Sequence, residues 1–285
     1  MSENTERQGS FGWRYFHFIE PSGRRINIVE HKTDIFGLEN KPYMTMITKE
    51  PYRKPLRFKG EPNLVWERGD SDTTRKFEFV FDNARFNGEI TEILEHRELK
   101  DVVLFEDKMG RKSHWTVGIP YGKIAGEIQT PQGKNGINGY VYQDQQWGDV
   151  LIQEWVKNWT WSHLANENLF VVIFCINTVD NQKSWHSIYG RGRDISVDQN
   201  FEVPHLAKLE KSGNLQNELT RAEIKIPGKL SAAFALIPNN IMRLRIQENH
   251  LGFSASYIRW SVDAITYPSN KTAQGIAEYM AIQKL

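Results

Sequence analysis

Short runs in which apolar and polar residues alternate dominate the chain. The run 76–82 carries a phenylalanine at every second position, and the run 11–19 alternates in the same way with aromatic residues and a histidine. Such alternation is typical of a β-strand with one buried face. Further runs of this kind cover residues 25–30, 43–48, 85–90, 101–105, 114–119, 123–129, 159–164, 169–179, 184–189, 221–226, 230–237, 241–248, 254–263 and 275–282.

Turn-forming residues separate these runs. Gly, Pro, Asn or Asp stands in nearly every gap, which is typical of antiparallel barrels and sandwiches. Only residues 91–100 have apolar positions at helical spacing, and regular alternation of strand and helix patterns is absent. The pattern therefore predicts an all-β protein with few short helices and argues against a doubly wound parallel sheet.

A five-residue frame, aromatic-x-aromatic-x-His, occurs twice. Its copies are Trp13-Arg14-Tyr15-Phe16-His17 and Trp159-Thr160-Trp161-Ser162-His163, and each opens a series of strands of similar length. If the echo reflects a duplication, two consecutive antiparallel β-barrels meet near residue 148, with domains at 1–148 and 149–285. A chance match in an aromatic-rich chain is the alternative.

Charge and cysteine content exclude several classes of function. The 285 residues include 36 Lys and Arg against 35 Asp and Glu, so the chain has no basic field and we expect no nucleic-acid partner. The single cysteine, Cys175, lies in the apolar run 169–176, which excludes an internal disulfide and predicts a buried thiol. The eight histidines have no ligand spacing and Gly-x-Ser-x-Gly does not occur, so we expect no metal, no cofactor and no Ser-His-Asp chemistry.

Targeting and membrane signals are not readable in the sequence. Residues 1–10 are polar, and no stretch of about 18 apolar residues occurs, so we expect a cytoplasmic protein. A basic cluster is interpreted as a solvated strand edge, with transient contact to an anionic membrane surface as the alternative. The cluster consists of Arg53, Lys54, Arg57 and Lys59.

The segment 139–148 contains the leading candidate for chemistry. Extended geometry points Tyr140, Tyr142 and Asp144 to one face. Burial in a low dielectric penalises the charged form of an Asp, which then either finds hydrogen-bond donors or holds its proton and can act as an acid. A carboxylate tied to backbone amides is the alternative.

Aromatic residues near Asp144 favour the acid. Their π faces attract a developing carbocation as they attract ammonium groups, so a ring-lined pocket suits protonation of an alkene. The rings concerned are Tyr140, Tyr142, Trp147, Trp159 and Trp161. His114, beside Trp115 on a preceding strand, either orients the Asp, hydrogen-bonds a substrate carbonyl, or serves only the structure.

One motif resembles that of a known family. The segment Tyr142-Gln143-Asp144-Gln145-Gln146-Trp147-Gly148 resembles the Tyr-His-Asp-His-Asn-Trp-Gly signature of the hydroxyneurosporene synthase (carotenoid hydratase) and AttH-like family, whose folds are tandem lipocalin-like barrels. Gln143 and Gln145 replace both histidines of that signature. Weaker matches cover residues 11–16, His114-Trp115 with the strand that follows, Trp159-x-Trp161 and residues 275–279.

The resemblance implies an enzyme of hydrophobic natural products. The family includes hydratases of isoprenoid alkenes and relatives that cyclise natural products, including Diels–Alderases. It implies Asp144 as the acid, with Tyr142 and His114 as further catalytic residues. The expected substrate-binding residues are aromatic: Trp13, Tyr15, Trp115, Tyr140, Trp147, Trp159 and Trp161.

The function expected from these observations is cofactor-independent cyclisation of a hydrophobic polyene or isoprenoid intermediate. The reaction is either initiated by a proton or is a Diels–Alder-type cycloaddition, in a cavity within or between the two barrels. One alternative is a hydratase that adds water to an isoprenoid alkene. Another is a carrier that binds lipophilic ligands without reaction. The substrate and the oligomeric state are left open.

Overall fold

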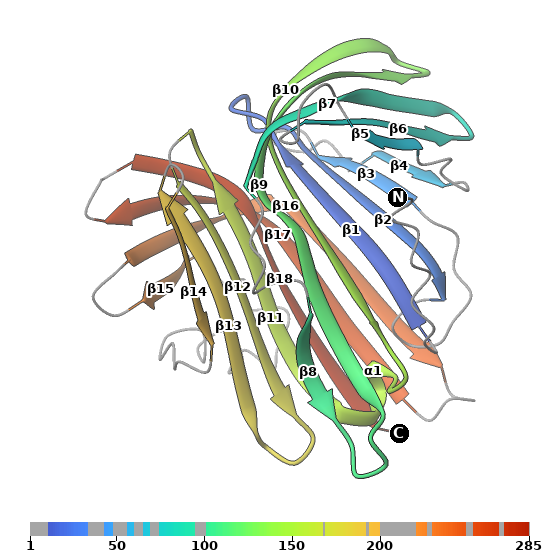
Figure 1. Cartoon of the computed structure of the whole chain (residues 1–285), viewed down its shortest axis with the longest axis vertical. Helices are drawn as coiled ribbons and strands as arrows, with labels where there is room; N and C mark the ends of the chain where they lie inside the picture. The colour runs from blue at the N-terminus through green and yellow to red at the C-terminus, as the bar shows by residue number, and fades with distance from the viewer. Residues whose placement is uncertain are drawn as a thin grey trace. The chain divides into compact units, whose positions relative to one another are not determined.

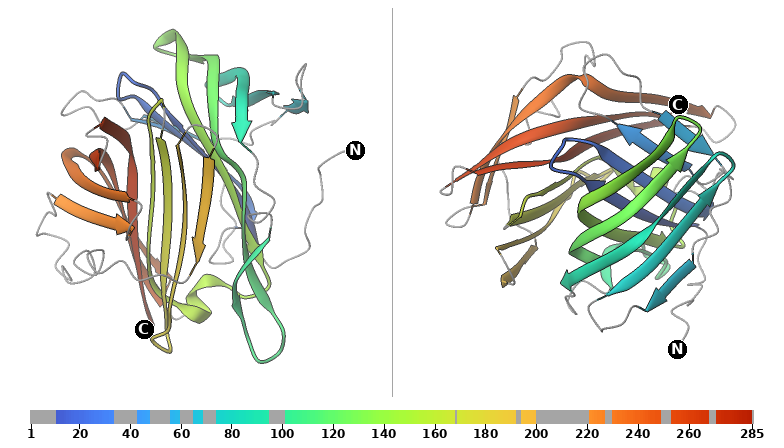
Figure 2. Two further views of the ribbon diagram at one scale, coloured as in Figure 1. Left: turned by 60° about the vertical axis from the view of Figure 1, so that its left-hand side comes forward. Right: turned by 90° about the horizontal axis from the view of Figure 1, so that it is seen from above.

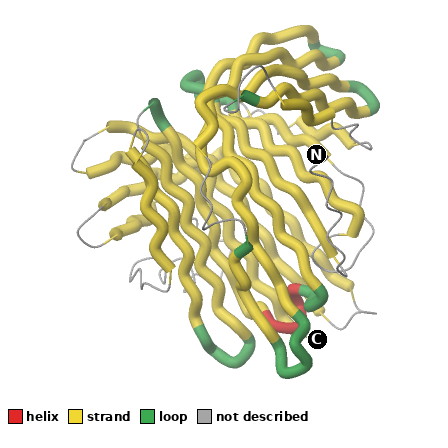
Figure 3. Tube along the Cα trace, in the orientation of Figure 1, coloured by secondary structure: helices red, strands yellow, loops and turns green. Residues whose placement is uncertain are grey.

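The computed structural model describes residues 11–33, 43–47, 56–59, 65–68, 74–94, 101–167, 169–191, 194–199, 221–226, 230–248, 253–267 and 271–284. Nearly all of this part of the chain is antiparallel strand, as Figure 3 shows in yellow. The predicted all-β class is therefore confirmed. The chain divides into two compact units: the first extends, with short exceptions, to Trp155, and the second consists chiefly of residues from Val156 onward.

The first unit is built on one large sheet, which is strongly curved in the right-hand view of Figure 2. Its strands, labelled in Figure 1, are β1 (Phe11–Ile19), β2 (Arg25–Thr33), β3 (Tyr43–Ile47), β4 (Leu56–Lys59), β5 (Val65–Arg68), β6 (Arg75–Phe81), β7 (Ala84–Leu94), β8 (Val102–Glu106), β9 (Lys112–Thr130) and β10 (Gly133–Gly148). The strand order is β4-β3-β2-β1-β10-β9-β7-β6-β5, and β8 pairs with β9.

The second unit contains an eight-stranded sheet. Its strands are β11 (Val156–Ala165), β12 (Leu169–Thr178), β13 (Lys183–Arg191), β14 (Asp194–Gln199), β15 (Arg221–Ile226), β16 (Leu230–Glu248), β17 (Phe253–Tyr267) and β18 (Lys271–Lys284). They follow the order β14-β13-β12-β11-β18-β17-β16-β15.

The two sheets share a plan. In the first, the opening strand β1 lies between β2 and the closing strand β10, and in the second β11 lies between β12 and β18. The repeated aromatic-x-aromatic-x-His frame therefore occupies the same place in both sheets. This agreement supports the interpretation of the echo as a duplication.

Phenylalanines cover one face of the first sheet. The alternating run in β6 buries Phe77, Phe79 and Phe81, and the ring of Phe86 meets that of Phe77 edge to face at 4.9 Å and 75°. Edge-to-face packing is a favourable arrangement of ring quadrupoles. The cluster also contains Phe16 and Phe18 of β1 together with aliphatic residues of the neighbouring strands. This apolar cluster forms the core of the first unit.

Some predicted elements differ from the observed ones. The runs 114–119 and 123–129 form one strand, β9, and the runs 230–237 and 241–248 form β16. The pairing register shifts within both strands, so each bends at an irregularity instead of ending. The helix expected at 91–100 is wrong for residues 91–94, which continue β7 and pair with β9, while residues 95–100 lie outside the described residues.

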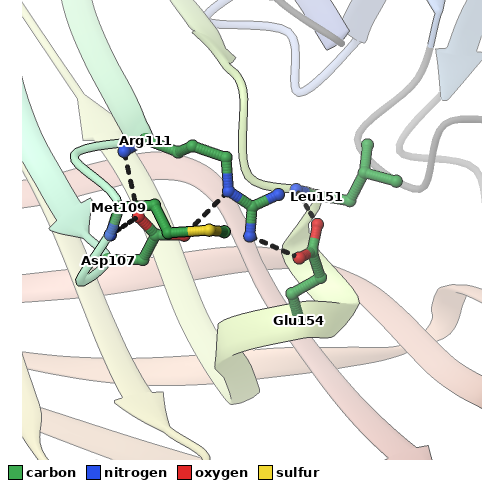
Figure 4. Close-up of polar contacts among 5 residues, drawn as sticks. All are labelled: Asp107, Met109, Arg111, Leu151 and Glu154. Atoms are coloured by element: carbon green, nitrogen blue, oxygen red, sulfur yellow. Dashed lines mark hydrogen bonds and ion pairs between the residues drawn. The ribbon is translucent and has the colours of Figure 1, made fainter.

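A polar network ties the turn between β8 and β9 to the short helix α1 (Ile152–Trp155), drawn red in Figure 3. Arg111 Nε donates to Asp107 Oδ2 at 2.7 Å, and Arg111 Nη2 donates to Glu154 Oε2 at 2.9 Å (Figure 4). The other oxygen of Glu154 accepts the Leu151 N–H at 3.0 Å. Desolvation acts to raise the pKa of Asp107, but hydrogen bonds from Arg111 and from the Met109 N–H bring it below its ordinary value.

No helix in the described ranges has the length and apolar character needed to cross a bilayer. Of the basic cluster, Arg53 and Lys54 lie outside the described residues, and Arg57 and Lys59 belong to β4.

Candidate active site

Asp144 lies in β10 between two long strands. Its register partners are Tyr15 of β1 and Val117 of β9. Only 3% of Asp144 is exposed, so its carboxyl is buried within the sheet that forms the first unit. Burying a carboxyl group costs free energy unless hydrogen bonds compensate for the lost water.

Two neutral donors bind the same oxygen of this carboxyl group. Trp115 Nε1 donates to Asp144 Oδ2 at 2.9 Å, and the Tyr142 hydroxyl donates to the same Oδ2 at 2.8 Å. A carboxyl oxygen has two lone-pair directions, and these two donors occupy both. When the carboxyl group is protonated, its hydrogen must therefore be on Oδ1.

Strand geometry explains how these three residues meet. Tyr142 precedes Asp144 by two residues, so both point to one face of β10. Trp115 is opposite Gln146 on β9 and points to the same face, because directly paired residues share a face. The sequence predicted the pairing of Tyr142 with Asp144, whereas Trp115, expected to contact substrate, donates its indole N–H to the carboxyl.

Further predicted residues share this face. Tyr15 is opposite Asp144, but its hydroxyl donates to Asn27 Oδ1 at 2.8 Å. Trp13 pairs with Gln146 in the register. Tyr140 stacks on Tyr121 with ring centroids 5.6 Å apart. The face that carries Asp144 is therefore rich in aromatic rings, as the sequence suggested.

His114 points to the opposite face of the sheet. It neighbours Trp115 in β9, so strand alternation turns it away from Asp144, and its register partner is Trp147. The two rings stack at 3.9 Å and 5°, and His114 Nδ1 lies 2.7 Å from Asp101 Oδ1. The structure thus separates His114 and Trp147 from Asp144 and gives His114 a carboxylate of its own.

Sequence reasoning did not single out Asp101. This residue belongs to no motif, and it meets His114 only because β8 pairs with β9. The prediction of that strand gave no register, so no signal in the sequence could identify the pair.

Trp159 and Trp161 belong to β11 of the second unit. They are 2% and 4% exposed, and Trp159 meets Phe174 of β12 edge to face at 6.3 Å. Both therefore pack within their own unit. The same unit holds the free Cys175, which is buried as predicted.

An open groove of about 640 Å³ lies along β6, β7 and β9, at some distance in sequence from the candidate site. Its lining includes Phe77, Gly88 and Gly126, and it contains none of the predicted site residues. The candidate site therefore depends on the buried carboxyl and not on this groove.

Comparison with known proteins identifies the fold. No protein-family model matches the sequence, and no curated protein sequence matches it. Among solved structures, a protein provisionally identified as AttH, from Nitrosomonas europaea, matches with a TM-score of 0.61 and 9% identity, over 94% of this chain and 91% of that one. CghA with Sch210972 matches with a TM-score of 0.53 and 8% identity, over 97% and 89% of the two chains.

A second structure of CghA gives a TM-score of 0.54 at 8% identity, over 98% of this chain and 89% of that chain. Identities this low establish the fold alone. The chain therefore has the architecture expected from the sequence: all-β, with consecutive lipocalin-like halves, as in these proteins.

Proposed function

We propose that this protein is a cofactor-independent cyclase of a hydrophobic polyene or isoprenoid intermediate, with Asp144 as its proton donor. The observation that supports the proposal is the buried carboxyl of Asp144, held on one oxygen by Tyr142 and Trp115. The match to CghA with Sch210972 supports it at the level of the fold.

The two donors give the carboxyl a reason to release its proton. When Oδ1 gives up its hydrogen, negative charge develops on the carboxylate, and hydrogen bonds to an ionised acceptor are about twice as strong as those between neutral groups. The bonds from Tyr142 and Trp115 therefore strengthen as the proton leaves. Donors aimed at developing charge stabilise the transition state more than the ground state.

The proposed reaction is a net isomerisation. The π electrons of a substrate alkene take the hydrogen from Oδ1, which forms a C–H bond and leaves a carbocation on the second carbon. A further alkene of the same substrate attacks that cation and closes a ring through a new C–C bond. Loss of a proton from the carbon beside the final cation to the Asp144 carboxylate forms the product alkene and restores the acid.

Aromatic rings on the Asp144 face suit this cation. Trp13, Tyr15 and Tyr140 lie on the same side of the sheet as the acid, and a ring face attracts a nearby cation by about 0.5–2 kcal/mol. A cycloaddition needs no such stabilisation. The ring-rich face therefore favours the proton-initiated route.

Asp144→Asn tests the proposal. The side-chain oxygen of Asn can still accept from Tyr142 and Trp115, but its NH₂ group is a poor acid. We expect turnover of linear polyene or isoprenoid substrates to fall by at least about 100-fold, the usual contribution of a general acid, with little change in thermal stability. Asp149→Asn, at an exposed carboxyl just beyond β10, is the matched control.

Reaction in heavy water separates the alternatives. Proton-initiated cyclisation places one solvent deuterium on carbon, whereas cycloaddition places none. A hydratase adds solvent oxygen, and a carrier binds ligand without forming product. Full turnover by Asp144→Asn would overturn the proposal.

A further inference from the structure

The two sheets carry a carboxyl group at the same position of their shared plan. Asp144 of β10 is opposite Tyr15, the middle aromatic residue of the frame in β1. Glu278 of β18 is opposite Trp161, the middle aromatic residue of the frame in β11. Since β10 and β18 are the closing strands of the two sheets, Glu278 is the counterpart of Asp144.

The residue that faces this carboxyl from the next strand differs between the units. Val117 of β9 pairs with Asp144, whereas Arg259 of β17 pairs with Glu278. Arg259 is 3% exposed, and its Nε and Nη2 both lie 2.6 Å from Glu278 Oε1. A buried guanidinium at this distance neutralises the Glu278 carboxylate.

The donors around the carboxyl differ as well. Tyr142, two residues before Asp144, corresponds to Ile276, which has no hydroxyl to donate. Trp115, two residues before Val117, corresponds to Tyr257, whose ring centroid lies 5.5 Å from the Arg259 guanidinium. The second unit thus combines a charged partner and an aromatic ring where the first has two neutral donors.

We infer that the second unit holds a second copy of the acid site in which Arg259 has turned the carboxyl into a structural ion pair. The residue at the Val117 and Arg259 position decides which role the carboxyl has. A valine there supplies no positive charge, so the carboxyl can hold a proton. An arginine there pairs with the carboxylate, because a buried ion of one sign strongly favours its opposite. The chain then has one proton donor, although it has two carboxyl positions; that half of the inference rests on the proposed function.

Exchanging the two residues tests this inference. Arg259→Val gives the second unit the residue of the first, and Val117→Arg does the reverse. Infrared spectroscopy at neutral pH counts protonated carboxyl groups through their carbonyl stretch. We expect one protonated carboxyl to be lost in Asp144→Asn, and one to be gained in R259V but not in the double variant R259V/E278Q. Val117→Arg should remove the Asp144 signal and lower turnover by at least about 100-fold.

Stability gives a second readout. Among the described residues, Glu278 is faced by Trp161 on β11, with His163 two residues further along, and by Arg259 on β17, with Tyr257 two residues before it. In R259V a buried Glu278 that holds its proton stabilises the fold less as pH rises, since the unfolded chain releases that proton more readily. The loss of Tm relative to the parent should therefore be smaller at pH 5 than at pH 8, and R259V/E278Q should remove this pH dependence.

The outcomes separate the two proposals. If Asp144→Asn removes no protonated carboxyl signal, the proposed function fails whatever happens at Glu278. If R259V is folded at neutral pH without a new signal, or if it unfolds at every pH while R259V/E278Q folds, the inference about the second unit fails and the proposed function stands. A Val117→Arg variant that folds and keeps both its signal and its turnover would also overturn the inference.

Discussion

At Asp144, the hydrogen bonds from Tyr142 and Trp115 set both the oxygen that exchanges a proton and the stability of the charge left behind. Part of this arrangement is readable in the sequence, because a spacing of two residues puts Tyr142 beside Asp144 on any strand. The contribution of Trp115 is not, since it depends on the register between β9 and β10. That register shifts on both sides of Gln143, and local sequence gives no sign of it.

Removing one donor should weaken the acid without removing it. In Tyr142→Phe the ring remains but the hydroxyl that binds Asp144 Oδ2 is lost, so the developing carboxylate has one donor fewer. We expect kcat to fall by about 100-fold, as when one donor to a developing charge is deleted in other enzymes. Steady-state turnover measures this.

Tyr140→Phe is the control for that variant, because Tyr140 lies on the same face two residues earlier. It should retain most of its turnover. Equal losses in the two variants would mean that the hydroxyl of Tyr142 has no special role.

His163 should make the protein sensitive to acid. Complete burial lowers its pKa to about 3 from an ordinary 6.5, so the folded protein keeps it neutral while the unfolded chain takes up a proton below about pH 6.5. This contribution to stability is present above pH 6.5 and is lost as pH falls, by about 1.4 kcal/mol for each pH unit down to about 3.

The free energy of unfolding, measured by denaturant between pH 7 and pH 4, checks this. His163→Leu should flatten the dependence on pH relative to the parent. A variant that loses stability as steeply as the parent on acidification would show that other groups cause the effect.

At the scale of elements, strand alternation sorts the predicted residues onto two faces. The face with Asp144 carries Tyr142 and Trp115, and the other carries His114 and Trp147 beside the strand positions of the phenylalanine core. Parity within a strand was readable, but the grouping of His114 with Asp144 was not supported, because adjacent residues on a strand point apart. The short strands β4, β5 and β14 were not predicted, since four to six residues give too little alternation.

Close approach of β7 and β9 makes one glycine pair sensitive to substitution. Gly126 is opposite Gly88 in the register, and a Cβ at Gly126 would lie 2.4 Å from the Asn87 carbonyl oxygen. Because backbone atoms cannot move aside cheaply, we expect Gly126→Ala to lower the free energy of unfolding by about 1–3 kcal/mol.

Gly136→Ala is the matched substitution, because a Cβ at Gly136 would meet nothing within 4 Å. Denaturant unfolding of both variants should show a loss for Gly126→Ala only. Equal stability of the two would show that β7 and β9 separate without cost.

For the whole molecule, two sheets with one plan carry different residues at the same register. The sequence revealed the plan through its repeated aromatic frame and predicted the fold class. It could not match Asp144 with Glu278, because these residues lie in different local sequences and correspond only through their partners Tyr15 and Trp161. Nor could it find Arg259, which is 19 positions from Glu278 in the chain and meets it across a strand pair.

Glu278→Gln should separate stability from catalysis. It leaves the buried Arg259 guanidinium without its carboxylate, which we expect to lower the free energy of unfolding by about 3–5 kcal/mol. Turnover of the folded variant should remain, unlike that of Asp144→Asn. Parallel denaturation and activity measurements check this, and a loss of turnover equal to that of Asp144→Asn would contradict it.

The two-faced construction of β10 also limits how this strand can change in length. Inserting a single residue between Tyr142 and Asp144 would turn every later side chain over, so that the carboxyl would face the side of His114 and Trp147. Amino-acid exchanges keep this parity, whereas odd-numbered insertions or deletions invert it. Variation among descendants of this gene should therefore preserve the count of residues between Tyr142 and Trp147 even where their identities differ.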